Sequence, residues 1–281
     1  MHNFNQKILQ AGLTKALEDK AVFTGLANNT FSGQINQKND IVKIVQAGDV
    51  DITAYTSSDI TVQSIADAAR EIIADQDAYW SFSLDTLEYN NVKGLLMQEY
   101  MRKAGYAANN SIDEFLAGKY AQAGIAQNTY AAPKDMTSLN VADEFLKMGT
   151  AFADAGIDRT ITKVALIRPW VSEKLALDAT ALLTTNVAEY RKGYVGTAHG
   201  WDFVESNNVV VGTESTQAKT CIMCIVPGES YGYASAVSLV ESMPMQERIG
   251  QTQVSGRFIY GGKIIRPDMT GVLYADKTAE A

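Results

Sequence analysis

Two stretches in the first third of the chain alternate apolar with polar residues, a pattern that predicts strands with one buried face. The first begins with IVKIV at residues 41–45 and continues through apolar residues at 50, 52 and 54. The second places Trp80, Phe82 and Leu84 in alternation with serines. We therefore expect two extended strands, and we expect Trp80 and Phe82 to be buried.

The segment that joins these strands is mostly polar and acidic. Its apolar residues would stripe one short helix at best: Ile65, Ala69, Ile72 and Ile73. A segment with so little apolar surface cannot pack well against itself. We therefore expect an arm that finds its packing partner outside its own fold.

Helical periodicity follows the second strand. Asp85 and Glu88 form a cap-like pair before an apolar stripe that ends near Gly105. A second helix is predicted from Ser111, where Glu114 completes a capping box, to about Gly124. Residues 129–140 have the composition of a linker.

The second half mixes helices and strands. Asn140 is expected to cap a helix that ends at Gly156 and whose stripe is Val141, Phe145, Met148 and Phe152. A strand at 163–168, a helix from Pro169 to about 183, extended pieces at 203–212 and 219–227, and a final strand pair within 256–275 follow. Because no regular βαβ repeat is present, the predicted fold class is α+β.

Composition indicates a globular protein, with 46% hydrophobic and 20% charged residues. No apolar run approaches the roughly 20 residues of a membrane helix. The N-terminus lacks the apolar core of a secretory signal, so we expect a cytoplasmic protein. Residues 1–35 hold one short amphipathic piece, Ile8 to Leu17, and then a polar extended stretch typical of a tail or strap.

Charge argues against a protein that grips nucleic acid. The net charge is -8, from 32 acidic and 24 basic residues, and the basic residues are spread along the chain. Binding to phosphates requires clustered lysine and arginine. The same composition is compatible with a protein that only encloses nucleic acid.

Two cysteines stand as CIMC, the spacing of a redox motif, within KTCIMCIVP. Cys221 and Cys224 lie in an apolar stretch that reads as a buried strand, where positions i and i+3 point to opposite faces. We interpret them as core residues. His2 and His199 are far apart with no ligand at metal-site spacing, so no metal site is predicted.

GESYG at 228–232 matches the spacing of a nucleophile elbow, with Ser230 in the nucleophile's place. Pro227 interrupts the strand that should precede it, and no histidine follows it to serve as base. We interpret GESYG as a turn. GYVGTAHG at 193–200 lacks the spacing of a phosphate-binding loop, so its glycines are expected in a loop. No catalytic, cofactor-binding or metal-binding residue is predicted, and no cofactor.

The order of these pieces resembles that of the tailed-phage major capsid proteins, the Hong Kong 97 fold family. NDIVKIVQAGDVDITAYT is similar to the start of the family's extended arm, and DAYWSFSLDTLE to its exit into a long spine helix. ITKVALIRPWVSEKLALD resembles the core of the axial domain, GWDFVESNNV the loop and strand after it, and RFIYGGKIIRPDMTGVLY the strands that complete the peripheral domain. The resemblance covers about residues 20–275.

The resemblance implies a division of the chain. Residues 1–35 would be an N-terminal arm, 36–84 an extended β-arm (E-loop) with peripheral-domain strands, and 85–136 a spine helix with the peripheral domain. Residues 137–245 would form the axial domain, and 246–281 the return strands of the peripheral domain.

The resemblance also implies a function. The chain would be a structural major capsid (head) protein that self-assembles into hexamers and pentamers of an icosahedral shell around packaged double-stranded DNA, without sequence-specific binding. Its partners would be its own copies, with scaffolding, portal and decoration proteins, and no membrane. It would be found in the virion after assembly in the host cytoplasm. The arm would gain its packing partner from the adjacent chain.

Two features refine this expectation. Some members crosslink neighbours through a lysine and an asparagine, but no lysine lies between Lys43 and Lys93, so a non-crosslinked shell is expected. The acidic balance would either keep DNA from adhering to the inner wall or serve as an ordinary solubility charge.

Two alternatives remain open from the sequence. An encapsulin-like nanocompartment shell has the same fold and encloses a cargo enzyme in place of DNA. A cytoplasmic α/β enzyme would require a pocket with convergent polar groups.

Overall fold

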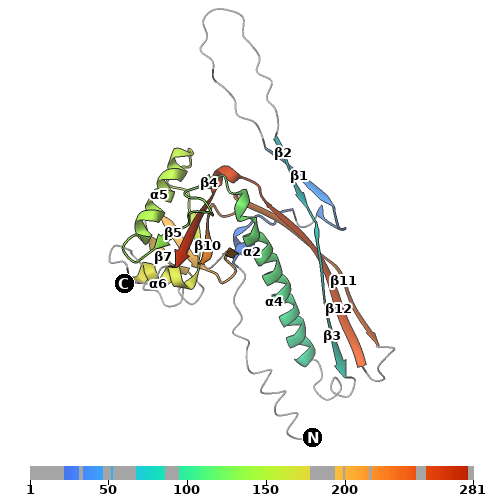
Figure 1. The fold of residues 1–281 in the computed structure, drawn as a ribbon. Coiled ribbons are helices and arrows are strands. Elements are labelled where there is room, and N and C mark those ends of the chain that lie inside the picture. Colours follow the sequence, from blue (N-terminus) through green and yellow to red (C-terminus); the bar gives the residue numbers. More distant parts are fainter. Residues whose placement is uncertain are drawn as a thin grey trace, which may run out of the picture.

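Two large β-sheets and one two-stranded sheet organise the described part of the chain. The structure is a computed structural model, which describes residues 22–31, 34–46, 52, 68–85, 95–177, 194–198, 200–214, 217–244 and 251–277. One large sheet belongs to an α/β block, and the other is a long curved ribbon that extends away from it with a helix alongside (Figure 1). The predicted class, α+β, is confirmed.

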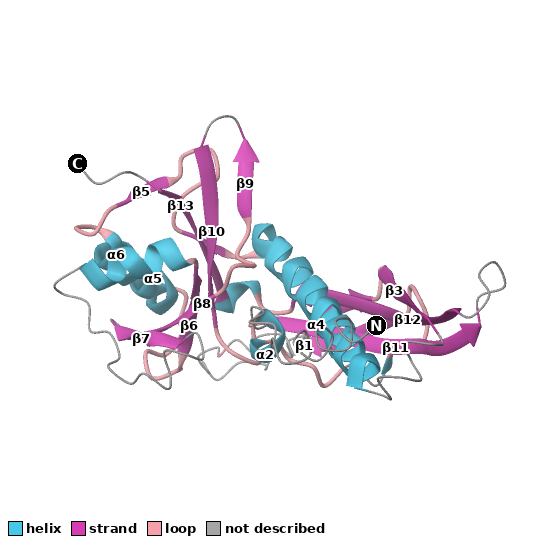
Figure 2. Cartoon of the chain, turned by 90° about the horizontal axis from the view of Figure 1, so that it is seen from below, coloured by secondary structure: helices cyan, strands magenta, loops and turns pink. Residues whose placement is uncertain are grey.

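An eight-stranded sheet forms the block, in the order β4-β13-β10-β6-β8-β7, with β5 beside β13 and β9 beside β10. Its strands are β4 (Ile125–Ala126), β5 (Lys134–Met136), β6 (Lys163–Ile167), β7 (Tyr194–Ala198), β8 (Trp201–Glu205), β9 (Val211–Glu214), β10 (Gln217–Ile225) and β13 (Thr270–Lys277). All five residues of β6 are buried, as a central strand requires. Helices α5 (Val141–Asp154) and α6 (Pro169–Leu177) lie together to one side of the sheet (Figure 2).

Three antiparallel strands form the ribbon: β11 (Tyr231–Pro244), β12 (Gln251–Ile264) and β3 (Gln76–Asp85). Helix α4 (Leu95–Ala117) runs beside them, and β1 (Ile41–Gln46) pairs with β2 (Ala68–Ile73) in a separate two-stranded sheet. The short elements are α2 (Phe23–Leu26), η2 (Gly118–Gln122) and η3 (Pro267–Met269). The strands predicted at 41–45 and around Trp80 are therefore confirmed.

Helix α4 corrects the prediction of two helices. It continues through Gly105 and Ser111, where an end and a new start were expected. Gly105 lowers helix stability by about 1 kcal/mol relative to alanine, a cost that packing of the flanking turns outweighs. Ser111 does not cap, since its Oγ lies 3.1 Å from the Tyr260 hydroxyl. Residues 86–94, which contain most of the predicted helix start, lie outside the described residues.

One helix prediction and one strand-pairing prediction are wrong. Residues 68–73 form strand β2 and not a short helix, because pairing with β1 places Ile72 opposite Val42 in a small shared core. Strands β12 and β13 do not pair with each other: β12 joins β3, and β13 joins β10. The segment 246–281 is thus divided between the two sheets, since η3 and the residues before it carry the chain across.

The described residues form three apolar clusters. The first lies against α5 and α6 and contains the predicted stripe of Val141, Phe145, Met148 and Phe152, each 0% exposed. The second lies on the opposite face of the eight-stranded sheet and reaches α4 and the beginning of the ribbon. The third lies under the β1–β2 hairpin. The eight-stranded sheet is therefore packed on both faces.

Ser230 holds the junction at which the chain passes between the two sheets. It is fully buried in the turn that connects β10 to β11. Its Oγ accepts the Val226 N–H at 2.9 Å and donates to the Met269 carbonyl at 2.7 Å. Its carbonyl accepts the Ile265 N–H at 2.9 Å. The β10–β11 and β12–β13 connections are therefore tied together at one residue, and GESYG contains the expected turn.

We expect Ser230→Ala to lower the free energy of unfolding by about 1–3 kcal/mol, because the Val226 N–H and the Met269 carbonyl lose their buried partner. Urea unfolding measures this change. Ser242→Ala, at an exposed position of β11, is the control and should stay within about 0.5 kcal/mol of the parent. Equal effects of the two substitutions would contradict the role given to Ser230.

Candidate assembly surfaces

The two cysteines lie on opposite faces of β10. Cys221 packs in the second cluster and Cys224 in the first, so the interpretation as core residues is confirmed. Burial raises the pKa of the Cys221 thiol to about 12 and raises that of Cys224 as well. Neither thiol forms a reactive thiolate at neutral pH, so CIMC is not a redox motif here.

The structure also tests the predictions for the glycine-rich segment 193–200 and for a metal site. Residues 194–198 are strand β7, paired with β8 across a register shift, which corrects the expectation of a loop. Gly200 has a φ of +81°, a conformation that favours glycine. His2 and His199 lie outside the described residues. In the described ranges, no group of three His, Cys, Asp or Glu side chains is placed to hold a metal ion, and no helix is long and apolar enough to cross a membrane.

Residues 22–28, which we call the strap, lie across the junction of the two sheets. The buried Asp113 carboxylate on α4 accepts the N–H groups of Val22 at 2.9 Å and Thr24 at 2.8 Å. The same carboxylate accepts the Thr24 hydroxyl at 2.8 Å and the Asn208 side-chain amide at 3.1 Å. Asp113 therefore joins the strap and α4 to the loop that follows β8.

The rest of the strap binds the beginning of the ribbon. Asn28 donates its N–H to the Tyr231 carbonyl at 2.8 Å and accepts the Tyr233 N–H at 3.0 Å. Phe23, 1% exposed, meets the Tyr231 ring edge to face. The strap thus packs on its own subunit, although the polar composition of this region suggested little internal packing.

The β1–β2 hairpin crosses the ribbon at two glycines. A Cβ atom at Gly261 would collide with the main chain of Ile73, and one at Gly232 would collide with the side chains of Ile265 and Ile72. Only glycine allows so close an approach of main chain to main chain at residue 261. These glycines fix the point from which the hairpin departs. Residues 47–51 and 53–67, the remainder of the predicted arm, lie outside the described residues.

The ribbon has an aromatic face toward α4. Trp80 and Phe82 stack with ring centroids 5.6 Å apart, and Phe82 meets Tyr100 of α4 at 5.3 Å. Both residues are only partly buried, which corrects the expectation of full burial. A helix that covers one side of three strands leaves part of that face in solvent.

The opposite face carries polar side chains. Tyr79 is 81% exposed, and Arg257 forms an ion pair with Asp77 across β12 and β3. The Arg257 guanidinium lowers the pKa of the Asp77 carboxyl. At the base of the hairpin, Ile41 and Ile73 face each other in register and are 51% and 45% exposed. An exposed apolar pair of this kind suits a contact with another chain.

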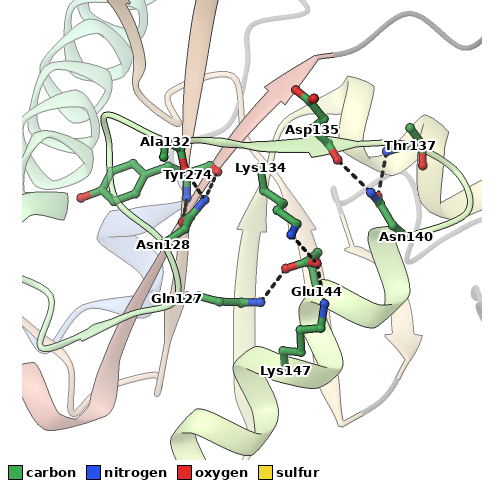
Figure 3. A network of polar contacts seen from close by, with 10 residues as sticks. All are labelled: Gln127, Asn128, Ala132, Lys134, Asp135, Thr137, Asn140, Glu144, Lys147 and Tyr274. Atoms are coloured by element: carbon green, nitrogen blue, oxygen red, sulfur yellow. Dashed lines mark hydrogen bonds and ion pairs between the residues drawn. The ribbon is translucent and has the colours of Figure 1, made fainter.

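A polar network fixes the linker 129–140 and the two residues before it on the α/β block (Figure 3). Glu144 of α5 accepts hydrogen bonds from Lys147 at 2.8 Å and Gln127 at 2.7 Å and lies 3.7 Å from Lys134. Its hydrogen bond raises the pKa of the Lys147 amine. Glu144 itself is almost fully buried. This cluster therefore holds the linker against α5, while the Lys134 and Lys147 side chains stay about half exposed.

Asparagine side chains complete the same region. Asn128 accepts the Tyr274 N–H at 2.9 Å and donates to its carbonyl at 2.7 Å, filling the gap between β4 and β5 along β13. Asn140 precedes α5 as predicted, but its side chain accepts the Thr137 N–H and donates to the Asp135 carbonyl instead of capping the first turn. Leu139, beside it, is 90% exposed.

We expect both thiols to stay unreactive toward a thiol reagent at about pH 9, although a free cysteine would be largely ionised there. Because burial raises both folded-state pKa values, stability should fall once the pH passes the unfolded value of about 8.5, where only the unfolded state loses the proton. Absorbance of the thiol reagent, with and without denaturant, measures how far the two thiols react in the unfolded and folded chain. Rapid labelling of the folded chain would contradict the burial of β10.

We expect Asp113→Asn to lower the free energy of unfolding by about 1–3 kcal/mol, because its amide group would point a donor at the strap N–H groups. Hydrogen exchange of the Val22 and Thr24 amides should accelerate in this variant. Glu114→Gln, the exposed neighbour on α4, is the control and should leave both amides protected. Unchanged protection in Asp113→Asn would show that the carboxylate does not hold the strap.

No protein-family model matches this sequence, and no curated protein matches it significantly. Several solved structures are similar to this chain. A chain of Mycobacterium phage Che8 has 19% identity and a TM-score of 0.68, covering 92% of this chain and 93% of its own. The capsid of Cyanophage P-SCSP1u has 15% identity and a TM-score of 0.69, covering 94% and 90%. The capsid of Ralstonia phage GP4 has 14% identity and a TM-score of 0.65, covering 95% and 93%.

These similarities extend over 92–95% of the chain, and they confirm at the level of fold the resemblance that the sequence indicated. The chain has the α+β fold of tailed-phage capsid proteins.

Proposed function

We propose that this chain is a major capsid protein whose copies form hexamers and pentamers of an icosahedral shell around packaged double-stranded DNA. The observation that carries the proposal is the similarity to phage capsid structures over 92–95% of this chain, at TM-scores of 0.65–0.69. A match of this extent covers nearly the whole chain and not only one common motif.

The proposed division of the chain is the one that the sequence resemblance implies. Residues 1–35 serve as the N-terminal arm, 36–84 as the extended β-arm with peripheral strands, and 85–136 as the spine helix with the peripheral domain. Residues 137–245 provide the axial domain. In the last segment, 246–281, β12 returns to the peripheral sheet, while β13 completes the axial sheet, a role supported by its pairing with β10.

Beyond its base, which packs on its own ribbon, the arm binds an adjacent copy. Support comes from its base, where Ile41 and Ile73 remain half exposed. The chain acts in the virion after assembly in the host cytoplasm, with scaffolding, portal and decoration proteins as further partners. It has no catalytic role, and its shell is not crosslinked through arm lysines, since none lies between Lys43 and Lys93.

The net charge of -8 suits a wall along which DNA must slide during packaging. The shell encloses the genome without sequence-specific binding. Among the described residues, the exposed lysines near α5 are offset by carboxylates, as at Glu144. Weak attraction to phosphate follows from this dispersion of positive charge.

We expect Gly261→Ala to give a soluble, folded subunit that no longer forms closed particles, because the new Cβ displaces the Ile73 main chain and redirects the arm. Negative-stain electron microscopy of purified parent and variant measures the outcome. The parent should show closed, uniform shells, and the variant should show open or irregular assemblies.

Gly105→Ala is the matched control, since nothing lies within 4 Å of its added Cβ. It should assemble like the parent and gain up to about 1 kcal/mol of helix stability. Closed shells from Gly261→Ala would show that the arm's direction does not govern assembly. Parent shells that contain a cargo protein and no DNA would favour an encapsulin-like compartment, and a parent that forms no shells would contradict the capsid function.

A further inference from the structure

Strand β3 forms an open edge of the ribbon. The sheet order is β11-β12-β3, and β3 pairs with β12 without interruption from Gln76 to Asp85. Within the described part of the chain, no backbone hydrogen bond joins β3 to any other strand. Every second residue of β3 therefore directs its N–H and carbonyl away from the sheet, a pattern that another strand can pair with.

The other edge of the same sheet is protected. Strand β11 has a register shift between Val237 and Leu239, ends at Pro244, and pairs with Asn28 of the strap near its start. Bulges, prolines and covering segments are the features by which proteins block sheet edges. Strand β3, QDAYWSFSLD, has no proline, no lysine and no register shift. The contrast indicates that β3 is covered by a partner.

The side chains of β3 leave its edge accessible. The Trp80 ring lies over Gly256 of β12, so closely that a Cβ there would collide with it. Phe82 stacks on Trp80 and on Tyr100 of α4. On the other face, Arg257 of β12 holds the Asp77 carboxylate, with Nε to Oδ1 at 2.8 Å. These contacts draw the large side chains toward β12 and α4.

We propose that β3 pairs in antiparallel fashion with β3 of a second copy, about a two-fold axis normal to the sheet and centred on Trp80, so that two ribbons form one continuous sheet. The partner is a second copy because copies are the neighbours in a shell, so this inference rests on the proposed function. A two-fold axis normal to the sheet keeps both α4 helices on the same side, as a wall with distinct inner and outer faces requires.

Charge selects the register. In an antiparallel pair centred on Ser81, Asp77 would face Asp85 of the partner subunit, and opposed carboxylates destabilise a pair of strands. Centring on Trp80 places Asp77 opposite Ser83 of the partner subunit and Tyr79 opposite Ser81 of the partner subunit. This register is the longest overlap of β3 with itself that avoids facing carboxylates, and it pairs residues 76–84 of both copies.

Cysteine pairing tests both the contact and the register. Tyr79 and Ser81 are exposed, so Tyr79→Cys and Ser81→Cys chains should fold like the parent. Facing residues of antiparallel strands have Cβ atoms about 4.5–5.5 Å apart, near the range of a disulfide. We expect particles co-assembled from the two variants to give disulfide-linked dimers on a non-reducing gel after mild oxidation. Particles of either variant alone should give none, and the buried native thiols should not contribute.

Met243→Cys, on the same sheet at the opposite edge and 54% exposed, is the matched control and should give no dimer when co-assembled with Tyr79→Cys chains. Dimers from Ser81→Cys alone would contradict the Trp80-centred register. Dimers with the Met243→Cys control as strong as with Ser81→Cys would show unspecific contact. Intact particles without any dimer would overturn the β3 pairing and leave the capsid function standing, whereas absence of particles from the parent would refute that function first.

Discussion

The β10–β11 and β12–β13 connections both join the block to the ribbon, and the arrangement of these two sheets depends on how the two connections are held together at Ser230. A fully buried hydroxyl bonds the end of β10 to the turn before β13, while the carbonyl of the same residue bonds the residue after β12. Such bonds contribute little individually, but an unpaired donor or acceptor in this interior is costly. The junction therefore penalises any other relative placement of the sheets.

The strap and Asp113 add a second attachment at the same place. A carboxylate buried on α4 receives neutral donors from the strap and from the loop after β8, so three segments distant in sequence meet at one side chain. The ribbon, α4 and the hairpin base extend from this junction with one face still open. A subunit that makes these polar contacts within its own junction and leaves the β3 edge unpaired among the described residues is suited to repeated contacts with identical neighbours.

The sequence predicted those parts whose signal is local. The alternation around Trp80, the stripe from Val141 to Phe152 and the Pro–Gly turn before Ser230 each specify an element through residues adjacent in the chain. The predicted helix end at Gly105 was wrong, because a glycine ends a helix only where tertiary contacts do not override its low helix propensity. The pairing of β2, the crossing at Gly261 and the bonds of Asp113 depend on residues far apart in sequence, so no local pattern could reveal them. The periodicity of the sequence likewise does not show that β3 lies at an edge of its sheet, where a second copy could pair with it.

The proposed function requires repeated self-association of the subunit. Sedimentation velocity of the purified protein over a wide concentration range measures this association. We expect capsomers and megadalton particles whose share grows with concentration, since each contact between neighbours binds only the folded chain. A single species of 30.5 kDa at every concentration would contradict it.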